Sequence, residues 1–593
     1  MLGFRARGNR PDLRRIPASL PLAARMVAAA PLAVLSVAAA LAQTASEVTP
    51  PSFEPQLRRM PGTLAFSGEP GLAAPKGADR LSISIAKVDV AGTLPGLEAE
   101  TRALEQRLTR GPIAVSEIFE AASALEEAYV NAGFVLARVV LPAQNLADGG
   151  TLRLVVVDGF VESVDTNAVP AQVRDRLERL TDSLIGKRGL KRSELERQVL
   201  LAGDTYGIAL ESALATGTRP GGTIVILKPA YREITGFIGF DNFQSDDLGT
   251  WSLDAGLEFN GFLGLGEVFY IRGSGYPGGP FSDDGFFSEY PLYRVLAAGA
   301  VIPLNADGLS FNLELTRSDT GEEYLDTPTS SVFKRASARL FYPVVRSRAF
   351  NLTTQIGLDL ESDTFDIRAD AGDIPVYDDR LSVLRAAADA SWLRPDGSAI
   401  DTGAIFSVGL DALGARAEED TVDGTPLSRQ GANVDFNKIE LYGNYRRPVG
   451  EDFVLLLHAR GQYSFGDPLL ISEQIGIANF DEISTLGEGT LNGDSGWVVR
   501  GEIVRPVELD MADRPIGLRP YAFASTGAVY LEEPQFGEAA TVRADAYGIG
   551  VETILVRDPA FSTASVRLEL GRGYRDDGGE DGTRLSVVGS FRF

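Results

Sequence analysis

The chain contains no cysteine and a single histidine among its 593 residues. Without cysteine there is no disulfide framework, no thiolate chemistry and no cysteine-ligated metal. One histidine cannot build a histidine metal cluster, and it leaves one candidate base for a Ser-His-Asp arrangement. That residue, His458, lies in the strand-like run FVLLLHARGQYSF, so we interpret it as part of a wall. Since a GxxxxGK[ST] phosphate-binding loop is also missing, we predict no enzymatic activity, no cofactor and no metal site.

Positive charge and long apolar runs are also scarce. The chain has 56 Lys and Arg against 81 Asp and Glu, a net charge of −25, which argues against a nucleic-acid partner. Beyond residue 42 there is no apolar run of roughly 18 residues, the length that a membrane-spanning helix needs. The mature chain is therefore either soluble or crosses a membrane as a β-barrel.

Residues 1–42 have the composition of a signal peptide. Six arginines between Arg5 and Arg25 precede the apolar run MVAAAPLAVLSVAAAL, and the small residues of Ala40-Leu41-Ala42 predict cleavage before Gln43. The alternative, a membrane anchor, is disfavoured because the run is short and rich in alanine. Residues 43–80 are rich in Pro, Gly and Ala, which predicts a flexible linker.

Two units with the same predicted order of elements follow, at residues 81–157 and 158–230. Each reads strand, helix, helix, strand, strand. In the first unit, the run SEIFEAASALEEAYVNAG places Ile118, Ala122 and Leu125 on one helical face. Small α+β units of this kind can bind an extended chain by strand addition to a sheet edge. The alternative is that they serve as spacers.

From residue 231 to residue 593 the helical period is lost and strand-like runs recur. We count sixteen candidate strands, many of which alternate apolar with small or polar residues. Such alternation suits a barrel wall with one face on lipid and the other on a wet lumen, and an even strand number is typical. A soluble β-sandwich is disfavoured because so many serial strands without a helix rarely make one soluble unit.

A long Gly-rich loop interrupts the strands near residues 467–496. It is followed by the alternating strand WVVRGEIV, and together they form the stretch EQIGIANFDEISTLGEGTLNGDSGWVVRGEIVRP. Its glycines allow tight folding because glycine tolerates positive φ. A loop of this length is uncommon in a compact domain and is usually functional or disordered.

This GxGxLxGDxG loop before a VxRxE strand resembles the sixth extracellular loop of the two-partner-secretion transporters, the outer-membrane exporters of large haemolysins and filamentous adhesins. Two more stretches resemble that family, YREITGFIGFDNFQSDDLGTW and RPYAFASTGAVY. The run GFVLARVVLPAQNLADGGTLRLVVVDGFVESV resembles its first POTRA domain. The resemblance covers residues 81–593 and implies a transmembrane β-barrel of about sixteen antiparallel strands behind two POTRA domains. Family members often carry an N-terminal plug helix, but residues 43–80 contain no amphipathic helix, so none is predicted.

In the family, a V-R-G-aromatic loop tip and an F-x-D-x-G wall motif pair through Arg and Asp inside the barrel. Here the resemblance places Ser484 at the Arg position and Ser525 at the Asp position. We expect the loop to remain folded into the lumen, held by neutral hydrogen bonds and by packing of Leu486. The residues that the resemblance assigns to the loop are Ile483, Ser484, Thr485, Leu486, Gly487, Glu488, Gly489, Gly493, Asp494 and Gly496. Those assigned to the wall motif are Phe523, Ser525 and Gly527, and those of the first-strand motif are Asp241, Asn242, Phe243 and Gly249.

The chain ends at Phe593, with Phe591 on the same strand face, which resembles the terminal signal read by the barrel-assembly machinery. The resemblance implies a bacterial outer-membrane pore, with its POTRA domains in the periplasm, that exports one large secreted β-rich protein without ATP. It also implies that the protein is a monomer. Two alternatives stay open. One is an assembly factor for other barrels, and the other is a passive porin with accessory domains.

Overall fold

The computed structural model describes residues 43–53, 65–66, 74–321, 328–369, 371–418, 424–511, 514–535, 537–579 and 581–593. The predicted signal peptide, residues 1–42, lies outside this range. Across the described ranges, no helix combines the length and the hydrophobicity needed to cross a membrane.

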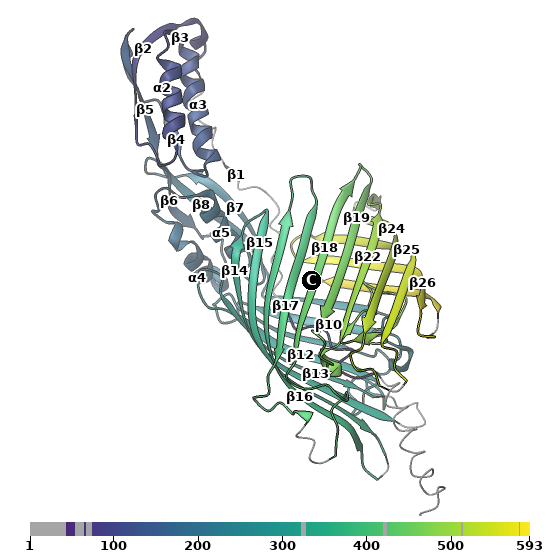
Figure 1. Cartoon of the computed structure of the whole chain (residues 1–593). Coiled ribbons are helices and arrows are strands. Elements are labelled where there is room, and N and C mark those ends of the chain that lie inside the picture. Colours follow the sequence, from purple (N-terminus) through teal and green to yellow (C-terminus); the bar gives the residue numbers. More distant parts are fainter. Residues whose placement is uncertain are drawn as a thin grey trace, which may run out of the picture. The chain divides into compact units, whose positions relative to one another are not determined.

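The first α/β unit packs two helices on a four-stranded sheet (Figure 1). The strand order in the sheet is β3-β2-β5-β4. Ile118, Leu125 and Tyr129 of α3 lie buried against the sheet, as their helical spacing predicts. The expected order of elements gains one short strand, β3. The elements are β2 (Ser82–Ala91), α2 (Glu98–Leu108), β3 (Pro112–Ala114), α3 (Val115–Asn131), β4 (Arg138–Val140) and β5 (Gly150–Val157).

The second unit repeats this arrangement with its own apolar core, in which Val173, Leu177 and Leu195 are fully buried. Its sheet has the order β1-β7-β8-β6, where the two-residue strand β1 adds in parallel to the edge of β7. The elements are β1 (Ala65–Phe66), β6 (Phe160–Asp165), α4 (Ala171–Thr181), α5 (Arg192–Gly203), β7 (Ile208–Thr216) and β8 (Gly222–Tyr231).

Within the described part of the chain, sixteen antiparallel strands close into a barrel, which confirms the predicted fold class. β22 and β23 form one wall strand, because both pair with β24 and only Arg505 and Pro506 separate them. Pro506 has no N–H to donate to the ladder, which accounts for the break. The wall consists of β9 (Ile234–Asp241), β10 (Ser252–Asn260), β11 (Val268–Gly275), β12 (Tyr293–Pro303), β13 (Ser310–Thr320), β14 (Thr329–Arg346), β15 (Phe350–Ile367), β16 (Ile374–Leu393), β17 (Ala399–Gly409), β18 (Asn437–Val449), β19 (Phe453–Tyr463), β22 (Ser495–Val504), β23 (Val507–Met511), β24 (Arg514–Tyr530), β25 (Thr541–Asp558), β26 (Ser562–Arg575) and β27 (Gly582–Arg592).

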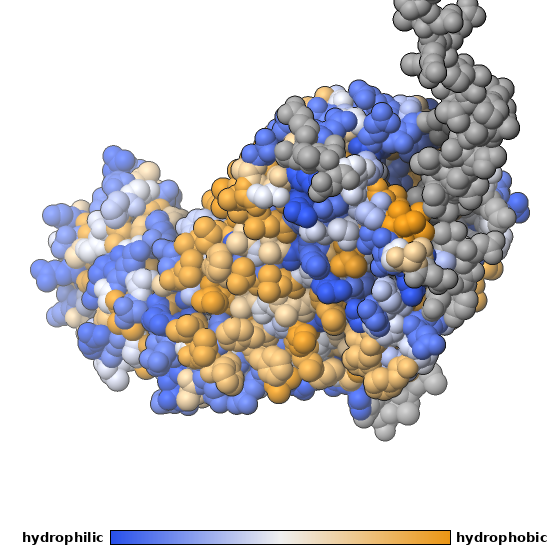
Figure 2. Space-filling model, turned by 90° about the horizontal axis from the view of Figure 1, so that it is seen from below, coloured by the Kyte–Doolittle hydropathy of each residue, from blue (hydrophilic) through white to orange (hydrophobic). Residues whose placement is uncertain are grey.

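The wall strands turn apolar side chains outward and polar side chains inward. In β13, Leu313 and Leu315 are 48% and 59% exposed on the outer face, whereas Asn312 and Glu314 are buried in the interior. This period of two is what a lipid-facing wall around a polar lumen requires. Figure 2 shows apolar side chains gathered over a broad part of the barrel surface, beside polar loops.

The barrel closes where β27 pairs with β9. Five residue pairs join the two strands, from Val588 opposite Asp241 to Arg592 opposite Phe237. The terminal Phe593 adds two backbone hydrogen bonds of 3.0 Å with Gly236. The predicted terminal signal, Phe591 and Phe593, therefore forms part of the closing seam, with the two rings stacked at 5.9 Å.

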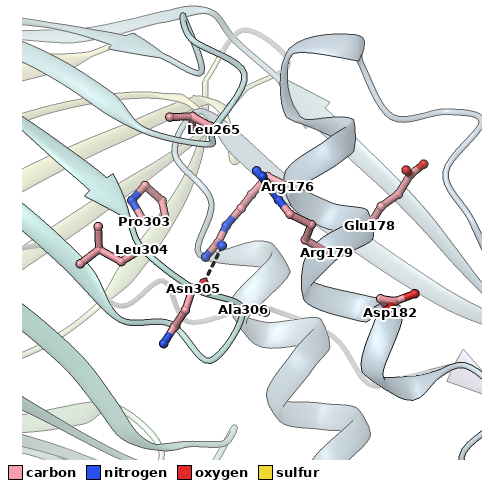
Figure 3. A pocket seen from close by; sticks show the side chains of 9 residues that line it. All are labelled: Arg176, Glu178, Arg179, Asp182, Leu265, Pro303, Leu304, Asn305 and Ala306. Carbon is pink, nitrogen blue, oxygen red and sulfur yellow. Dashed lines mark hydrogen bonds between the residues drawn. The ribbon is translucent and has the colours of Figure 1, made fainter.

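Helices α4 and α5 contact the turns at one end of the barrel, which we call the α/β end. Arg176 donates to the carbonyl of Asn305 at 2.6 Å, and Arg346 binds Asp204 at 2.7 Å. Figure 3 shows Arg176 and Arg179 extending from α4 toward the β12–β13 turn, beside a cavity of about 540 Å³. Burial, and then the charge of Arg179, lower the pKa of Arg176 to about 10, so it stays protonated at neutral pH. We call the opposite end the loop end.

Candidate functional site

The long loop between β19 and β22 folds into the barrel. Within the loop, two strands of two residues each, β20 (Ile475–Gly476) and β21 (Asn492–Gly493), pair in antiparallel fashion. Its apolar side chains join inward-facing side chains of the wall strands in one buried cluster. From the loop the cluster takes Ile475, Ile477, Ala478, Ile483, Leu486 and Leu491, and from the wall Val498, Val504, Tyr521, Phe523, Val529, Val542, Ala544 and Ala546. Packing of Leu486 is thus part of what holds the loop.

The loop tip is held by an arginine that comes from the wall. Ser484 is fully buried and its hydroxyl donates to Glu569 of β26. Arg500 of β22 donates to the same hydroxyl at 3.0 Å, and it also pairs with Glu569 and, at 2.7 Å, with Glu502. The guanidinium lies 4.0 Å from the centre of the Phe523 ring. A buried ion pair therefore fixes the tip, so the expectation of neutral hydrogen bonds alone is wrong.

Ser525 plays a different part from Ser484. Its hydroxyl is buried and has no hydrogen-bond partner among the residues that the structure describes, so the two serines do not bind each other. Ser525 lies directly opposite Arg500 in the β22–β24 ladder. Because the side chain of Ser525 is short, the side chain of Arg500 has room to extend over Phe523 toward Glu569. The sequence signal for this arrangement is the VxRxE strand, in which Arg500 and Glu502 share one face. The sequence gives no sign of Glu569 on β26, the third member of the arrangement.

The base of the loop is anchored by Glu473, in the 3-10 turn Ile471–Glu473. Its carboxylate pairs with Arg385 of β16 at 2.6 Å and with Lys438 of β18 at 2.9 Å. Burial by itself raises the pKa of Glu473, but the two cations outweigh it and lower the pKa to about 2. The carboxylate therefore stays ionised, and breaking one partner would leave an uncompensated buried charge.

Glu482 supplies a third anchor, just before the tip. Arg460 of β19 binds its carboxylate at 2.5 and 2.8 Å, and His458 lies 3.4 Å away. His458 also contacts Asn444 of β18 at 2.8 Å. The single histidine is thus a wall residue, as expected, and its ring faces the loop.

Asp494, one of the predicted loop residues, ties the end of the loop to its surroundings. Its carboxylate accepts hydrogen bonds from the backbone N–H groups of Leu469 and Glu532, at 2.9 and 2.7 Å. Arg429, in the connection between β17 and β18, lies 3.4 Å from it. Burial raises the pKa of Asp494, whereas the two N–H donors and Arg429 lower it, and the net shift is upward.

The predicted loop glycines lie where a side chain would collide. A Cβ on Gly493 would come within 2.9 Å of the Tyr530 carbonyl, and one on Gly489, at φ +73°, within 2.3 Å of Gln43. Gly487 and Gly496 have tight contacts at 3.3 and 3.0 Å. Close approach of the loop to its neighbours therefore accounts for these glycines.

Thr485 and Gly527 fit the same close packing. The side chain of Thr485 occupies the space that a Cβ on Gly571 or Gly573 of β26 would fill. A Cβ on Gly527 would lie 2.8 Å from the Trp497 carbonyl and 2.9 Å from Ile477 of the loop. Glycine in the F-x-x-x-G run thus lets the loop reach the wall.

The first-strand motif contacts both the closing seam and the loop. Asn242 bridges to β27, donating to the carbonyl of Leu585 and accepting from the N–H of Val587, both at 2.8 Å. Phe243 lies 4.9 Å from Phe480 of the loop. Asp241 caps the turn by accepting from the N–H of Phe243 at 2.9 Å.

Gly249 completes this motif. It has φ +84°, and a Cβ there would lie 2.5 Å from the Tyr276 ring, so glycine is required. The backbone N–H of Glu488 donates to the carbonyl of Phe243 at 2.9 Å, and Ile483 and Phe523 share the buried apolar cluster. The three stretches that the sequence singled out, near residues 241–249, 483–496 and 523–527, are therefore neighbours.

Residues 43–53 also lie inside the barrel, along the inner faces of β11 to β15. At one end Gln43 donates to the carbonyl of Glu488 and Thr320 donates to the carbonyl of Gln43. At the other end Phe53 packs on Tyr270 with ring centres 4.6 Å apart. The expectation of a flexible linker is wrong for this part, which we call the luminal segment. Its described residues form a turn at 45–48.

The luminal segment is held by hydrogen bonds to the wall and to the loop. Ser46 donates to Asp363 at 2.6 Å, and Arg339 donates to Ser52 at 2.7 Å. Asn492 of the loop donates to Glu47 at 2.6 Å. The loop and the luminal segment therefore occupy the lumen together and contact each other.

We expect opening of the loop to depend on pH through Glu488. Burial first, and then Asp241 and Asp254, raise the pKa of Glu488 from 4.5 to about 8. The folded loop thus keeps a proton that a released loop gives up above pH 4.5, so the folded loop loses stability as pH rises from 4.5 to 8. Single-channel recordings between pH 5 and 9 should show more frequent openings at higher pH.

The Glu488→Gln variant should lose most of this dependence, because its side chain carries no charge at any pH. Glu451→Gln, in an exposed turn, is the matched control and should behave as the parent protein does. An unchanged pH dependence in Glu488→Gln would contradict the assignment.

Comparison with known proteins agrees with this geometry. A sequence model of the haemolysin secretion/activation protein ShlB/FhaC/HecB matches residues 221–553, and one of the ShlB-type POTRA domain matches residues 83–159. The outer membrane transporter CdiB of Escherichia coli O6:K15:H31 (strain 536 / UPEC) is 22% identical over 414 residues, 68% of this chain and 66% of that protein. The heme/hemopexin transporter protein HuxB of Haemophilus influenzae (strain 86-028NP) is 21% identical over 305 residues, 48% of this chain and 49% of that protein. The matched region thus spans just under two thirds of the length of such relatives, or less.

Solved structures show the same fold. CdiB from Escherichia coli superposes with a TM-score of 0.64 at 16% identity, over 97% of this chain and 100% of that one. CdiB from Acinetobacter baumannii gives a TM-score of 0.56 at 14% identity, over 98% and 100%. The family match covers more than half of the chain. The chain belongs to the haemolysin secretion/activation protein family ShlB/FhaC/HecB, and it is an outer-membrane β-barrel preceded by POTRA domains.

Proposed function

We propose that this protein exports one large secreted β-rich partner protein across the outer membrane, in an unfolded state and without ATP. One observation carries the proposal. The lumen is occupied by two segments, the loop and residues 43–53, that belong to no wall strand. They can therefore leave without breaking a hydrogen bond of the barrel ladder, and their departure opens a path through a polar interior.

The partner would first meet the two α/β units in the periplasm. An extended chain can add to a sheet edge, where backbone hydrogen bonds supply affinity and side-chain pockets supply selectivity. In the first unit β3 and β4 are the edge strands, and in the second unit β6 is an edge strand. Such binding suits an unfolded client, whose backbone groups are free.

Passage through the barrel needs no bound nucleotide. Folding of the partner outside the cell removes the unfolded form and draws the export equilibrium outward. The relatives CdiB and HuxB are named as transporters, which supports a transport role for this chain. We further propose that a single copy suffices and that the seam residues Phe591 and Phe593 direct insertion by the barrel-assembly machinery.

Comparative proteomics of the culture supernatant and cell surface, with and without this protein, tests the proposal. We expect the loss of one large β-rich protein, restored by the parent gene. Loss of many outer-membrane barrels together would indicate an assembly factor instead. No change in either fraction would favour a passive pore.

A further inference from the structure

Three cations form a row on the lipid-facing side of the barrel. Arg317 of β13 lies directly opposite Lys334 of β14, Lys334 opposite Ser362 of β15, and Ser362 opposite Arg380 of β16. The side chains of Arg317 and Arg380 are 51% and 58% exposed. All of them share the outward face of their strands, because Lys334 is exposed and the next residue, Arg335, points inward.

The row marks the edge of the apolar band nearest the loop end. On the same outward face, the next positions toward the α/β end are apolar in β13, β14 and β15, and in β16 the buried Ser382 precedes Leu384. These positions include Leu315 and Leu313 in β13, Ala336 and Leu340 in β14, Leu360 and Ile356 in β15, and Leu384 in β16. Since α4 and α5 contact the other end of the barrel, the row lies at the level of the outer leaflet of the membrane.

The positive charge of the row is only partly balanced. Asp319 pairs with Arg317 at 2.7 Å and with Arg294 at 2.9 Å, and Asp378 pairs with Arg380 at 3.0 Å. Lys334 has no carboxylate within 4 Å in the described portion of the chain. Like charges directly opposite each other in a ladder are destabilising, so the pair of Arg317 and Lys334 favours a bound anion.

An apolar hollow lies beside the row, on the side toward the α/β end. It has a volume of about 660 Å³ and is lined by Ile271, Leu296, Leu315, Ala336 and Leu360, with Arg317 and Lys334 at its rim. Small and large side chains alternate across the ladder there, with Ala298 opposite Leu315, Leu315 opposite Ala336, and Ala336 opposite Leu360. The alanines leave space between the leucines, and this space makes the hollow.

We propose that this site binds a phosphorylated, acylated glycolipid of the outer leaflet, the lipid A part of lipopolysaccharide. A phosphate group of the lipid would lie against Lys334 and Arg317. One of its acyl chains would fill the hollow toward Leu296 and Leu360. The hollow is of the size of ligand pockets, roughly 300–1,000 Å³, and combines an apolar lining with a few polar groups at one end. Basic groups beside a bilayer attract anionic head groups in the same way.

The position of the site links it to the lumen. The inner faces of β13 to β15 hold the luminal segment, through Glu314, Arg339 and Asp363. A lipid bound on the outer face of these strands would stiffen the part of the wall that carries these contacts. The site is independent of the identity of the exported protein, so it stands or falls separately from the proposed function.

Native mass spectrometry of the full-length protein in detergent, titrated with Kdo2-lipid A, tests the proposal. We expect one lipid bound by the parent protein, and binding at least ten-fold weaker in R317Q/K334Q/R380Q, because each basic group contributes to the attraction. R572Q is the matched control. Arg572 is also exposed on the outer face of its strand, β26, where its guanidinium lies 5.3 Å from the centre of the Tyr574 ring. It does not belong to the row and does not line the hollow, so R572Q should bind as the parent does.

The hollow is tested separately with Ala336→Leu, which keeps all the cations and fills the space. Ala336→Leu should also weaken lipid binding. If the triple variant does not fold, the single variant K334Q replaces it and should weaken binding as well. Inorganic phosphate and phosphatidylglycerol serve as competitors. Displacement by phosphate alone would indicate a simple anion site, and equal binding of phosphatidylglycerol a general lipid surface. Either result, or parent-like binding in the triple variant, would overturn the proposal.

Discussion

Replacing Arg500 with methionine should free the tip of the long loop from the barrel wall. Arg500 is 2% exposed and joins Ser484 of the tip to Glu569 and Glu502 of the wall. Methionine keeps much of the apolar volume but leaves Glu569 buried without this partner. Removing one member of a buried ion pair costs about 3–5 kcal/mol. We expect the lower part of that range, because Arg567 remains 2.5 Å from Glu502.

The release of the loop can be measured in two ways. Protease added to intact cells should cut the loop of Arg500→Met faster than the loop of the parent protein. The purified variant should also show longer openings in planar bilayers. The barrel itself should still close, since Arg500 keeps its backbone position in the β22–β24 ladder.

Three further variants make this result specific. Arg500→Met/Glu569→Gln removes the unpaired charge as well, so it should recover part of the lost protection, because removing both partners is less costly than removing one. Ser484→Ala should have a smaller effect, since it loses hydrogen bonds but no charge. Arg572→Gln, on the outer face of β26, should behave as the parent protein does. Parent-like protection in Arg500→Met would mean that apolar packing alone holds the loop.

The alternation of side chains predicted the barrel well. Wall strands such as β13 and β22 bury about every second residue in the interior, and this period is visible in the sequence without any knowledge of neighbours. The same period placed Arg500 and Glu502 on one face of β22. It could not reveal that Arg500 meets Glu569, which is 69 residues away, because that contact depends on the registers of β24, β25 and β26.

The luminal segment illustrates a second limit. Residues 43–53 have no periodicity and two adjacent prolines, Pro50 and Pro51, and such a composition usually means a flexible chain. Their order comes from partners far along the sequence, such as Asn492, which donates to Glu47 from 445 residues away. A polar segment can be buried when its hydrogen bonds are satisfied by a wall. The composition of a segment cannot show which distant residues will bind it.

The wall motif shows a third limit, where resemblance was informative about position but not about chemistry. Ser484 and Ser525, which the family pattern singles out, are both buried. The resemblance places both serines where the family has a charged pair and predicts neutral hydrogen bonds there, whereas Ser484 binds the Glu569 carboxylate and Ser525 leaves room for Arg500. The charges that hold the tip lie instead on the wall, on Arg500 and Glu569.

Replacing residues 43–53 with a Gly-Ser segment of equal length should raise the conductance of the barrel several-fold. The change removes the contacts of Ser46, Ser52 and Phe53 with the wall and alters no wall strand. It also removes the hydrogen bond from Asn492 to Glu47, so the loop should open more often. Planar-bilayer recordings of the purified protein measure both effects.

Locking the same segment in place should have the opposite result. The chain has no cysteine, so Ser52→Cys/Ser337→Cys introduces a single thiol pair, at positions whose hydroxyl oxygens lie 3.3 Å apart. When oxidised, this variant should conduct no more than the parent and should stop export, because the segment cannot leave the lumen. Reductant should restore export, whereas Ser52→Cys alone should respond to neither treatment. Undiminished export by the oxidised variant would show that the partner passes without displacing residues 43–53, and the lumen would then need only the movement of the loop to open.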